Sequence, residues 1–270
     1  MAAGPQAIAA EVLAALDAGR QITPFSERGE RLSPADAYAV TAELRRLRTE
    51  RGEKQAGRKI GFTNRGIWAE YGVYAPIWGD IYDTTIIDVT PGARVDISSL
   101  PQPRIEPEIV LGIAGEPRAG MSLEETFATV GWIAHGFEIV QTQFRDWRFD
   151  WTDCVADNGL HGRLLIGPRR TVEPRERPAL LRALSAFRIA LSRDGTMIGE
   201  GSGANALDGP VHALTHLAGV LAGDALNPPL RPGEIVTTGT LTPAFPIRPG
   251  ERWATTLDCI DLPGLSVEFC

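Results

Sequence analysis

The nine residues RIEPEIVLG, from Arg104 to Gly112, have the composition of a buried β-strand that carries two acids. Side chains alternate between the faces of a strand, so Glu106 and Glu108 share one face at a spacing of roughly 7 Å. Pro107, between them, cannot donate a hydrogen bond to a neighbouring strand, which favours an edge strand or a bulge. The stretch therefore predicts a sheet in which two carboxylates meet at one place.

A divalent cation would explain why these acids lie among apolar residues. Two carboxylates that face one spot repel each other unless a proton or a cation lies between them, and hard cations such as Mg²⁺ or Mn²⁺ prefer oxygen ligands. Glu138, in the segment WIAHGFEIV, is a third acid with apolar neighbours. The alternative is a solvated strand face on which the acids pair with arginines such as Arg104. The apolar flanks and the matching third acid favour the metal site.

The composition excludes several classes of protein. The chain has 270 residues, of which 43% are hydrophobic and 23% are charged, as is usual for a globular protein. Its net charge of -7 argues against nucleic-acid binding. No apolar run approaches the roughly 20 residues that a membrane helix needs, and the N-terminus is a poor signal peptide. The three cysteines show no C-x-x-C spacing, which indicates reduced thiols in a cytoplasmic protein.

The order of helical and strand-like patterns in the sequence predicts a small helical region followed by a β-rich core. One helix is expected from Ile8 to Ala18, and a second from a Ser33 N-cap to about Gly52. Short apolar runs punctuated by Gly and Pro then follow, with a hairpin turn at Asp194-Gly195. We expect an α+β protein with an N-terminal helical region over 1–58 and a β-rich catalytic core over 59–270, which can also count as one domain.

Several ordered motifs resemble the 2-keto-4-pentenoate hydratase and 4-oxalocrotonate decarboxylase group of the fumarylacetoacetate hydrolase superfamily. The resemblance covers nearly the whole chain, including the PFSER segment from Pro24 to Arg28. The matching segments are Lys59-Ile60-Gly61-Phe62-Thr63, Pro103-Arg104-Ile105-Glu106-Pro107-Glu108-Ile109, Phe137-Glu138-Ile139-Val140, Asp146-Trp147, Val155-Ala156-Asp157-Asn158 and Thr238-Gly239-Thr240-Leu241-Thr242-Pro243.

The resemblance implies a mixed β-roll core and a divalent cation, usually Mg²⁺ with Mn²⁺ as an alternative. It implies that Glu106, Glu108 and Glu138 bind this cation, that Lys59 is catalytic, and that the substrate is a 2-oxo or 2-hydroxy-dienoic acid. Such an acid would react through a metal-stabilised enolate, which decarboxylation, hydration, C–C cleavage and ketonisation can share. Burial near the cation would lower the pKa of Lys59.

Other residues are candidates for contact with the substrate. Thr238 and Thr240 are expected to donate hydrogen bonds to it, or else only to close a hairpin. Asn158 belongs to the Val155-Ala156-Asp157-Asn158 segment that carries the resemblance, and is expected beside the substrate.

Two segments depart from the pattern of the group. Hydratases of the group typically have an acid in a P-D-[FY]-G segment, where this chain has Pro76-Ile77-Trp78-Gly79. The apolar Ile77 resembles the decarboxylase branch. After Asn158, a serine-bearing stretch is replaced by Gly159-Leu160-His161-Gly162, so we expect Leu160 to contact the substrate and His161 to act in catalysis or to cap the pocket.

The sequence therefore predicts a metal-dependent lyase, a decarboxylase or hydratase for small acids from meta-cleavage aromatic degradation, with the decarboxylase favoured. A C–C bond hydrolase or tautomerase on the same scaffold stays open, as does a non-catalytic partner subunit of a hydratase/decarboxylase complex. We expect a homo-oligomer, with a hetero-complex with a related enzyme as an alternative, and neither nucleic-acid nor membrane partners.

Overall fold

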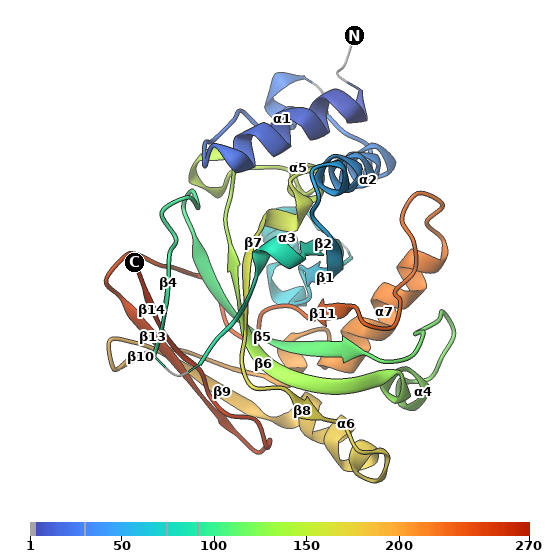
Figure 1. Cartoon of the computed structure of the whole chain (residues 1–270), viewed down its shortest axis with the longest axis vertical. Helices are drawn as coiled ribbons and strands as arrows, with labels where there is room; N and C mark the ends of the chain where they lie inside the picture. Colours follow the sequence, from blue (N-terminus) through green and yellow to red (C-terminus); the bar gives the residue numbers. More distant parts are fainter. Residues whose placement is uncertain (1–3, 30, 74, 91) are drawn as a thin grey trace.

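The computed structural model of the chain describes residues 4–29, 31–73, 75–90 and 92–270. Two N-terminal helices lie at one end of the molecule, and curved sheets with further helices make up the rest (Figure 1). The helices are α1 Pro5–Asp17, α2 Pro34–Glu50, α3 Trp68–Tyr71, α4 Leu123–Ala128, α5 Trp151–Ala156, α6 Arg177–Ala186 and α7 Pro210–Ala222. No helix in the described ranges is long and apolar enough to cross a membrane.

The strands form two sheets. They are β1 Gln55–Gly61, β2 Ile77–Tyr82, β3 Ile86–Asp88, β4 Ala93–Val95, β5 Arg104–Ile113, β6 Val130–Val140, β7 His161–Ile166, β8 Arg170–Thr171, β9 Arg188–Arg193, β10 Thr196–Ser202, β11 Ile235–Thr237, β12 Phe245–Pro246, β13 Arg252–Asp258 and β14 Ser266–Phe269. The larger sheet has the order β2-β1-β11-β5-β6-β7-β3, with β12 beside β5 and β8 beside β6. The smaller has the order β10-β9-β13-β14-β4.

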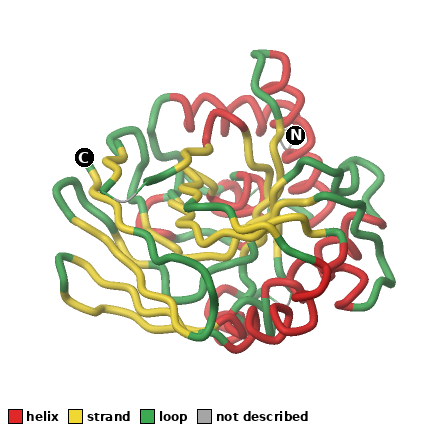
Figure 2. The backbone as a smooth tube through the Cα atoms, turned by 60° about the horizontal axis from the view of Figure 1, so that its bottom comes forward, coloured by secondary structure: helices red, strands yellow, loops and turns green. Residues whose placement is uncertain are grey.

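Strands β5 and β6 separate an apolar layer from a polar one. On one face, Ile105 and Phe137 pack with Trp253 and Phe269 of the smaller sheet in one hydrophobic cluster. The side chains that alternate with them point to the opposite face. Figure 2 shows the smaller sheet as strands at the left of the molecule, away from most of the helices. The apolar face thus fixes the direction in which the acids of β5 and β6 point.

Of the two expected settings of the Arg104–Gly112 strand, an edge or a bulge, the edge is wrong, because β5 lies inside the larger sheet, and its register shift falls at Gly112/Ile113 rather than beside Pro107. Its partner on one side is β6 along its length, and on the other side the partner changes from β11 to β12. Pro107 lies between these two short pairings, where its missing N–H leaves no gap in a ladder. The sequence showed that Pro107 interrupts the hydrogen bonding of the strand, but not that two different partner strands meet β5 on either side of it.

The N-terminal region matches the sequence expectation closely. Helix α2 begins after a capping box in which Ser33 and Asp36 exchange hydrogen bonds, with Pro34 at the first helical position. Both helices pack with α5 and with Ile77, Val140 and Leu160 in one hydrophobic cluster. The mixed fold, the curved sheet and the small helical region are confirmed, and the boundary at residue 58 stays a prediction.

Candidate active site

Three carboxylates meet on the polar face of β5 and β6. Glu106 lies directly opposite Glu138 in the antiparallel register, and Glu108 follows two residues later on the same face. One carboxylate oxygen from each lies within 4.8 Å of the others, and no other group of three potential metal-binding side chains was found in the described part of the chain. The structure therefore brings together the three acids that the sequence singled out.

The acids are too close and too buried for all three to ionise freely. Burial and the neighbouring Glu138 raise the pKa of Glu106 to about 7, although Lys59 works against the shift. Burial, with Glu138 and Glu106, also raises the pKa of Glu108 well above its usual range. Burial opposes ionisation of Glu138 as well, but Lys59 and His161 outweigh it and lower the pKa of that carboxyl.

Lys59 is the positive charge next to these acids. It projects from β1, its side chain is 4% exposed, and its Nζ lies 3.1 Å from Oε2 of Glu138. Burial favours the neutral amine, but the carboxylates of Glu138, Glu106 and Glu108 together outweigh it, so the pKa of Lys59 is raised. The expected lowering applied to Lys59 beside a bound cation, so it stays a prediction for the metal-bound protein.

A tight turn after β11 holds Glu108. The backbone N–H of Gly239 donates to Oε2 of Glu108 at 2.7 Å, whereas the buried Oε1 has no hydrogen-bond partner. Gly239 has a φ of +97°, and a Cβ there would lie 1.9 Å from Oγ1 of Thr63, so only glycine fits. The turn thus orients one carboxylate oxygen and leaves the other free for a ligand.

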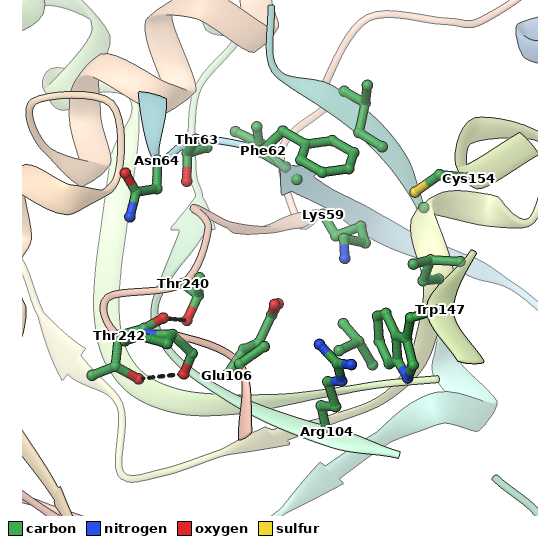
Figure 3. Close-up of a pocket in the computed structure, with 18 of the residues that line it drawn as sticks. Lys59, Phe62, Thr63, Asn64, Arg104, Glu106, Trp147, Cys154, Thr240 and Thr242 are labelled. Carbon is green, nitrogen blue, oxygen red and sulfur yellow. Dashed lines mark hydrogen bonds between the residues drawn. The ribbon is translucent and has the colours of Figure 1, made fainter. Parts of the chain in front are cut away.

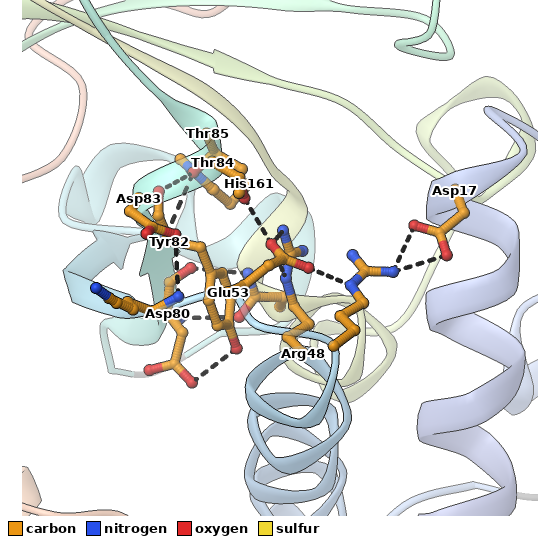
Figure 4. A network of polar contacts seen from close by, with 12 residues as sticks. Asp17, Arg48, Glu53, Asp80, Tyr82, Asp83, Thr84, Thr85 and His161 are labelled. Carbon is orange, nitrogen blue, oxygen red and sulfur yellow. Dashed lines mark hydrogen bonds and ion pairs between the residues drawn. The ribbon is translucent and has the colours of Figure 1, made fainter.

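His161 lies behind Glu138. Its Nδ1 is 2.8 Å from Oε1 of Glu138, and its Nε2 is 2.9 Å from Oγ1 of Thr85. Burial lowers the pKa of His161 despite the nearby carboxylate, which favours a neutral ring that donates from Nδ1. Figure 4 shows His161 and Thr85 near a polar network that includes Arg48 and Glu53 at the end of α2. This position suits orientation of Glu138 rather than contact with a substrate.

A cavity of about 270 Å³ opens beside the acids and contains Lys59 and Glu106 in its wall. Figure 3 shows these two side chains extending into the same space, with Arg104 and Trp147 at one side and Thr240 and Thr242 at another. Its apolar wall is formed by Phe62, Ile77, Val140, Trp147, Phe149 and Leu160. The cavity has room for a small molecule next to the carboxylates.

The predicted substrate-contacting residues separate into two groups. Ile77, Leu160 and Thr240 line the cavity. Asn158 lies in the structure with its side chain bonded to both backbone groups of Asp80, at 2.8 Å each, and the Thr238 hydroxyl donates to the Ile109 carbonyl at 3.0 Å. Neither residue is among those that line the cavity, so the geometry gives both a supporting position.

Arg104 and Trp147 line the cavity but were not among the predicted site residues. The sequence held a signal for Arg104, since it lies two residues before Glu106 and so shares its strand face. Trp147 comes from a loop after β6, and its Asp146-Trp147 motif is compatible with a loop that braces the metal site as well as with plain packing. Arg104 also forms no ion pair with Glu106 or Glu108, contrary to the solvated-face alternative.

The donor set fits one divalent cation. Three carboxylates and one ammonium sum to a formal charge of -2 when all are ionised. The unpartnered Oε1 of Glu108 and the raised pKa values show that the protein alone does not satisfy these acids. Carboxylate oxygens at this spacing are typical ligands of Mg²⁺ or Mn²⁺.

The family model for the C-terminal region of fumarylacetoacetate hydrolase matches residues 85–263. A 2-hydroxyhexa-2,4-dienoate hydratase from Comamonas testosteroni is 31% identical, covering 90% of each chain. A 4-oxalocrotonate decarboxylase from a Pseudomonas species is 32% identical, covering 81% of this chain and 83% of its own.

Among solved structures, the 4-oxalocrotonate decarboxylase from Pseudomonas putida G7, complexed with magnesium and adipate, superimposes with a TM-score of 0.89. It is 27% identical, and the match covers 98% of this chain and 97% of that one.

Proposed function

Since this chain belongs to the fumarylacetoacetate hydrolase family, we propose that it is a divalent-metal-dependent lyase for a small 2-oxo or 2-hydroxy-dienoic acid. Its relatives with these activities are a hydratase and a decarboxylase. The observation that carries the proposal is the meeting of three buried carboxylates and one lysine at the wall of a small cavity. The metal would be Mg²⁺, as in the solved relative, with Mn²⁺ as the alternative.

Glu106, Glu108 and Glu138 would hold the cation. When bound, it would supply Lewis-acid chemistry to the carboxylate and the neighbouring oxygen of a 2-oxo acid. His161 would hold Glu138 in one orientation through its Nδ1, and Gly239 would do the same for Glu108. Oε1 of Glu108 has no hydrogen-bond partner in the described protein, so it would be available to the cation.

Lys59 would donate the proton that the reaction requires. In the decarboxylation of a 2-oxo-3-enedioate, the bond to the distal carboxyl carbon breaks and CO₂ leaves without that electron pair. The pair shifts along the conjugated chain to the C2 oxygen, which then takes up one proton. Lys59 lines the cavity and is paired as an ammonium with Glu138, so its position would allow it to donate that proton.

We favour the decarboxylase over the hydratase because of Ile77. This residue is 3% exposed and contributes an apolar side chain to the cavity wall where a hydratase would have an acid. Adding water to a double bond requires a group that orients or deprotonates the water, and an isoleucine does neither. Loss of CO₂ requires no such group, so an apolar side chain at this position is compatible with decarboxylation.

Direct turnover tests the proposal. Purified protein with Mg²⁺ should consume 2-oxo-3-hexenedioate with release of CO₂, and 2-hydroxypentadienoate should be consumed much more slowly. The ultraviolet absorbance of each conjugated acid follows its consumption. Faster loss of 2-hydroxypentadienoate would favour the hydratase. Failure to consume either acid while Mg²⁺ is bound would favour a hydrolase, a tautomerase or a non-catalytic subunit.

The assembly and location of the protein remain proposals. We propose a homo-oligomer in the cytoplasm, with association with a related enzyme as the alternative. Three free cysteines, of which Cys154 is buried, agree with a reducing compartment. Light scattering of the purified protein, alone and mixed with a related hydratase, would measure the number of chains in each assembly.

A further inference from the structure

Arg104 places a second cation in the cavity wall, where it partly offsets the rise that burial causes in the pKa of Glu106 but forms no ion pair within 4 Å among the described residues. Lys59 and Arg104 are the two positively charged side chains among the described residues that line the cavity, and Lys59 is paired with Glu138. The guanidinium of Arg104 forms no ion pair with a described acid, and its Nε is buried without a hydrogen-bond acceptor. A buried donor of this kind costs free energy unless an acceptor reaches it. The described part of the chain therefore supplies no acceptor for this Nε.

Trp147 fixes the plane of this guanidinium. The central carbon of the guanidinium lies 4.0 Å from the centre of the Trp147 ring, which is cation–π contact. A face that lies on an indole cannot accept other ligands, but the edge of the guanidinium keeps its N–H donors. Two parallel N–H groups at such an edge match the two oxygens of a carboxylate.

The loop that carries Trp147 has a conformation that needs support. Asp146 and Trp147 have φ values of 59° and 58°, which are uncommon for residues other than glycine. Gln102 supports the loop, because its side-chain oxygen accepts from the Asp146 backbone N–H at 2.9 Å and its carbonyl accepts from the Trp147 indole at 3.2 Å. Unfavourable backbone conformations that the surroundings hold in place are concentrated at ligand sites. Here the loop serves to place an aromatic ring under an arginine.

The position of Arg104 along β5 sets the length of a ligand that could reach it. Arg104 and Glu106 share a face, and the register places them opposite Val140 and Glu138. These two levels of the sheet are roughly 7 Å apart. Five carbon–carbon bonds in an extended chain span about 6 Å. A six-carbon acid with one end at the three carboxylates would therefore bring its other end to Arg104.

We propose that Arg104 binds the second carboxylate of the substrate, so that this enzyme selects 2-oxo dicarboxylic acids of about six carbons over monocarboxylic acids of the same length. The proposal rests on the proposed function, since it assumes that the 2-oxo end lies at the three acids. Between the two ends, Val140 and Leu160 line the cavity and suit the uncharged middle of such a chain. Arg104 would be a specificity-determining residue, stacked on Trp147.

Binding of two matched acids tests this directly. Isothermal titration calorimetry of the full chain with Mg²⁺ would measure the affinities of 2-oxohexanedioate and 2-oxohexanoate, which differ only in the distal carboxylate. The wild-type protein should prefer the diacid by about 10- to 100-fold, the range expected for a charge-assisted hydrogen-bonded pair. In Arg104→Met, which keeps an apolar chain on Trp147, the diacid should bind about as weakly as the monoacid.

A matched variant controls for the loss of an arginine that lies over a tryptophan. Arg169 also stacks on an indole, that of Trp132 at 5.1 Å, but it is not among the residues that line the cavity. Arg169→Met should keep the wild-type preference. Arg104→Lys, which retains the charge but not the paired donors, should recover only part of it.

The outcomes separate this proposal from the proposed function. Equal affinities of the wild-type protein for the two acids would overturn the proposal without the need for any variant. A preference that survives in Arg104→Met would also overturn it, and so would an equal loss of affinity for both acids, which would place Arg104 at their common end. If neither acid binds while Mg²⁺ does, the proposed function itself fails, and the diacid site fails with it.

Discussion

Two buried charge clusters lie on opposite faces of β1, and they differ in their balance of charge. Arg58 and Lys59 are adjacent, so their side chains point to opposite sides of the sheet. Arg58 lies 3.1 Å from Asp80, which also pairs with Arg45 at 2.8 Å, and Glu234 lies 3.9 Å from Arg58. Two cations there face two acids.

The cluster around Lys59 has one cation and three acids. Both clusters are buried and both use neighbouring strands, so burial alone does not distinguish a structural site from a functional one. In the cluster around Arg58 the formal charges cancel, whereas the excess of two negative charges around Lys59 calls for an additional cation. The imbalance, rather than the presence of charge, identifies the site.

The balanced cluster should give the largest effect on stability. Asp80→Asn would leave Arg58 and Arg45 buried next to each other without their shared counter-charge. Removing one partner of a buried ion pair costs about 3–5 kcal/mol, so the free energy of unfolding should fall by that amount in urea denaturation. Asp88→Asn is the matched control, because Asp88 pairs with Arg169 at the surface and should contribute little. A small loss in Asp80→Asn would mean that the two clusters do not differ as argued.

The unbalanced cluster around Lys59 should instead be stabilised by a bound metal ion. Mg²⁺ at 100 times its dissociation constant should stabilise the wild-type protein by about 2.7 kcal/mol, measured as a shift in thermal unfolding. Glu106→Gln should remove this shift and the activity while the metal-free protein stays folded, because an amide in place of one acid lowers the repulsion among the three.

A control for this prediction is Glu268→Gln on β14. Glu268 faces Arg94 at 3.3 Å outside the cavity, so the full stabilisation by Mg²⁺ should remain. Wild-type response to the cation in Glu106→Gln would contradict the metal assignment, and a Mg²⁺-insensitive wild-type protein would contradict the charge argument.

The residues of β5 and β6 explain why the acids could be predicted from the sequence. Period-two alternation assigns Glu106 and Glu108 to one face without any knowledge of the partner strand, and the apolar residues that flank them make two carboxylates there exceptional. The capped α2 helix was predictable for the same reason, since the signal from Ser33, Pro34 and Asp36 lies within four residues.

Long-range partners could not be predicted in this way. The role of Trp147 depends on a loop that Gln102 holds from 45 positions away, and the surroundings of Lys59 depend on strands 79 residues later in the chain. The carboxylates alone raise the pKa of Lys59, whereas the lowering expected beside a bound cation stays a prediction. Sequence patterns predict which face a side chain takes but not which charges it meets.

The smallest predicted effect concerns His161, which connects the unbalanced cluster to the rest of the protein. His161→Phe keeps a ring behind Glu138 but removes the Nδ1 donor 2.8 Å from it. Contacts that orient a metal ligand typically change metal affinity about 10- to 100-fold when lost, so Mg²⁺ should bind that much more weakly by calorimetry. Diacid affinity, measured at saturating Mg²⁺, should stay near the wild-type value if His161 only positions Glu138. His216→Phe, on α7, is the control and should leave both affinities unchanged. A loss of diacid affinity at saturating metal would instead place His161 in contact with the substrate, in agreement with the catalytic role that the sequence suggested.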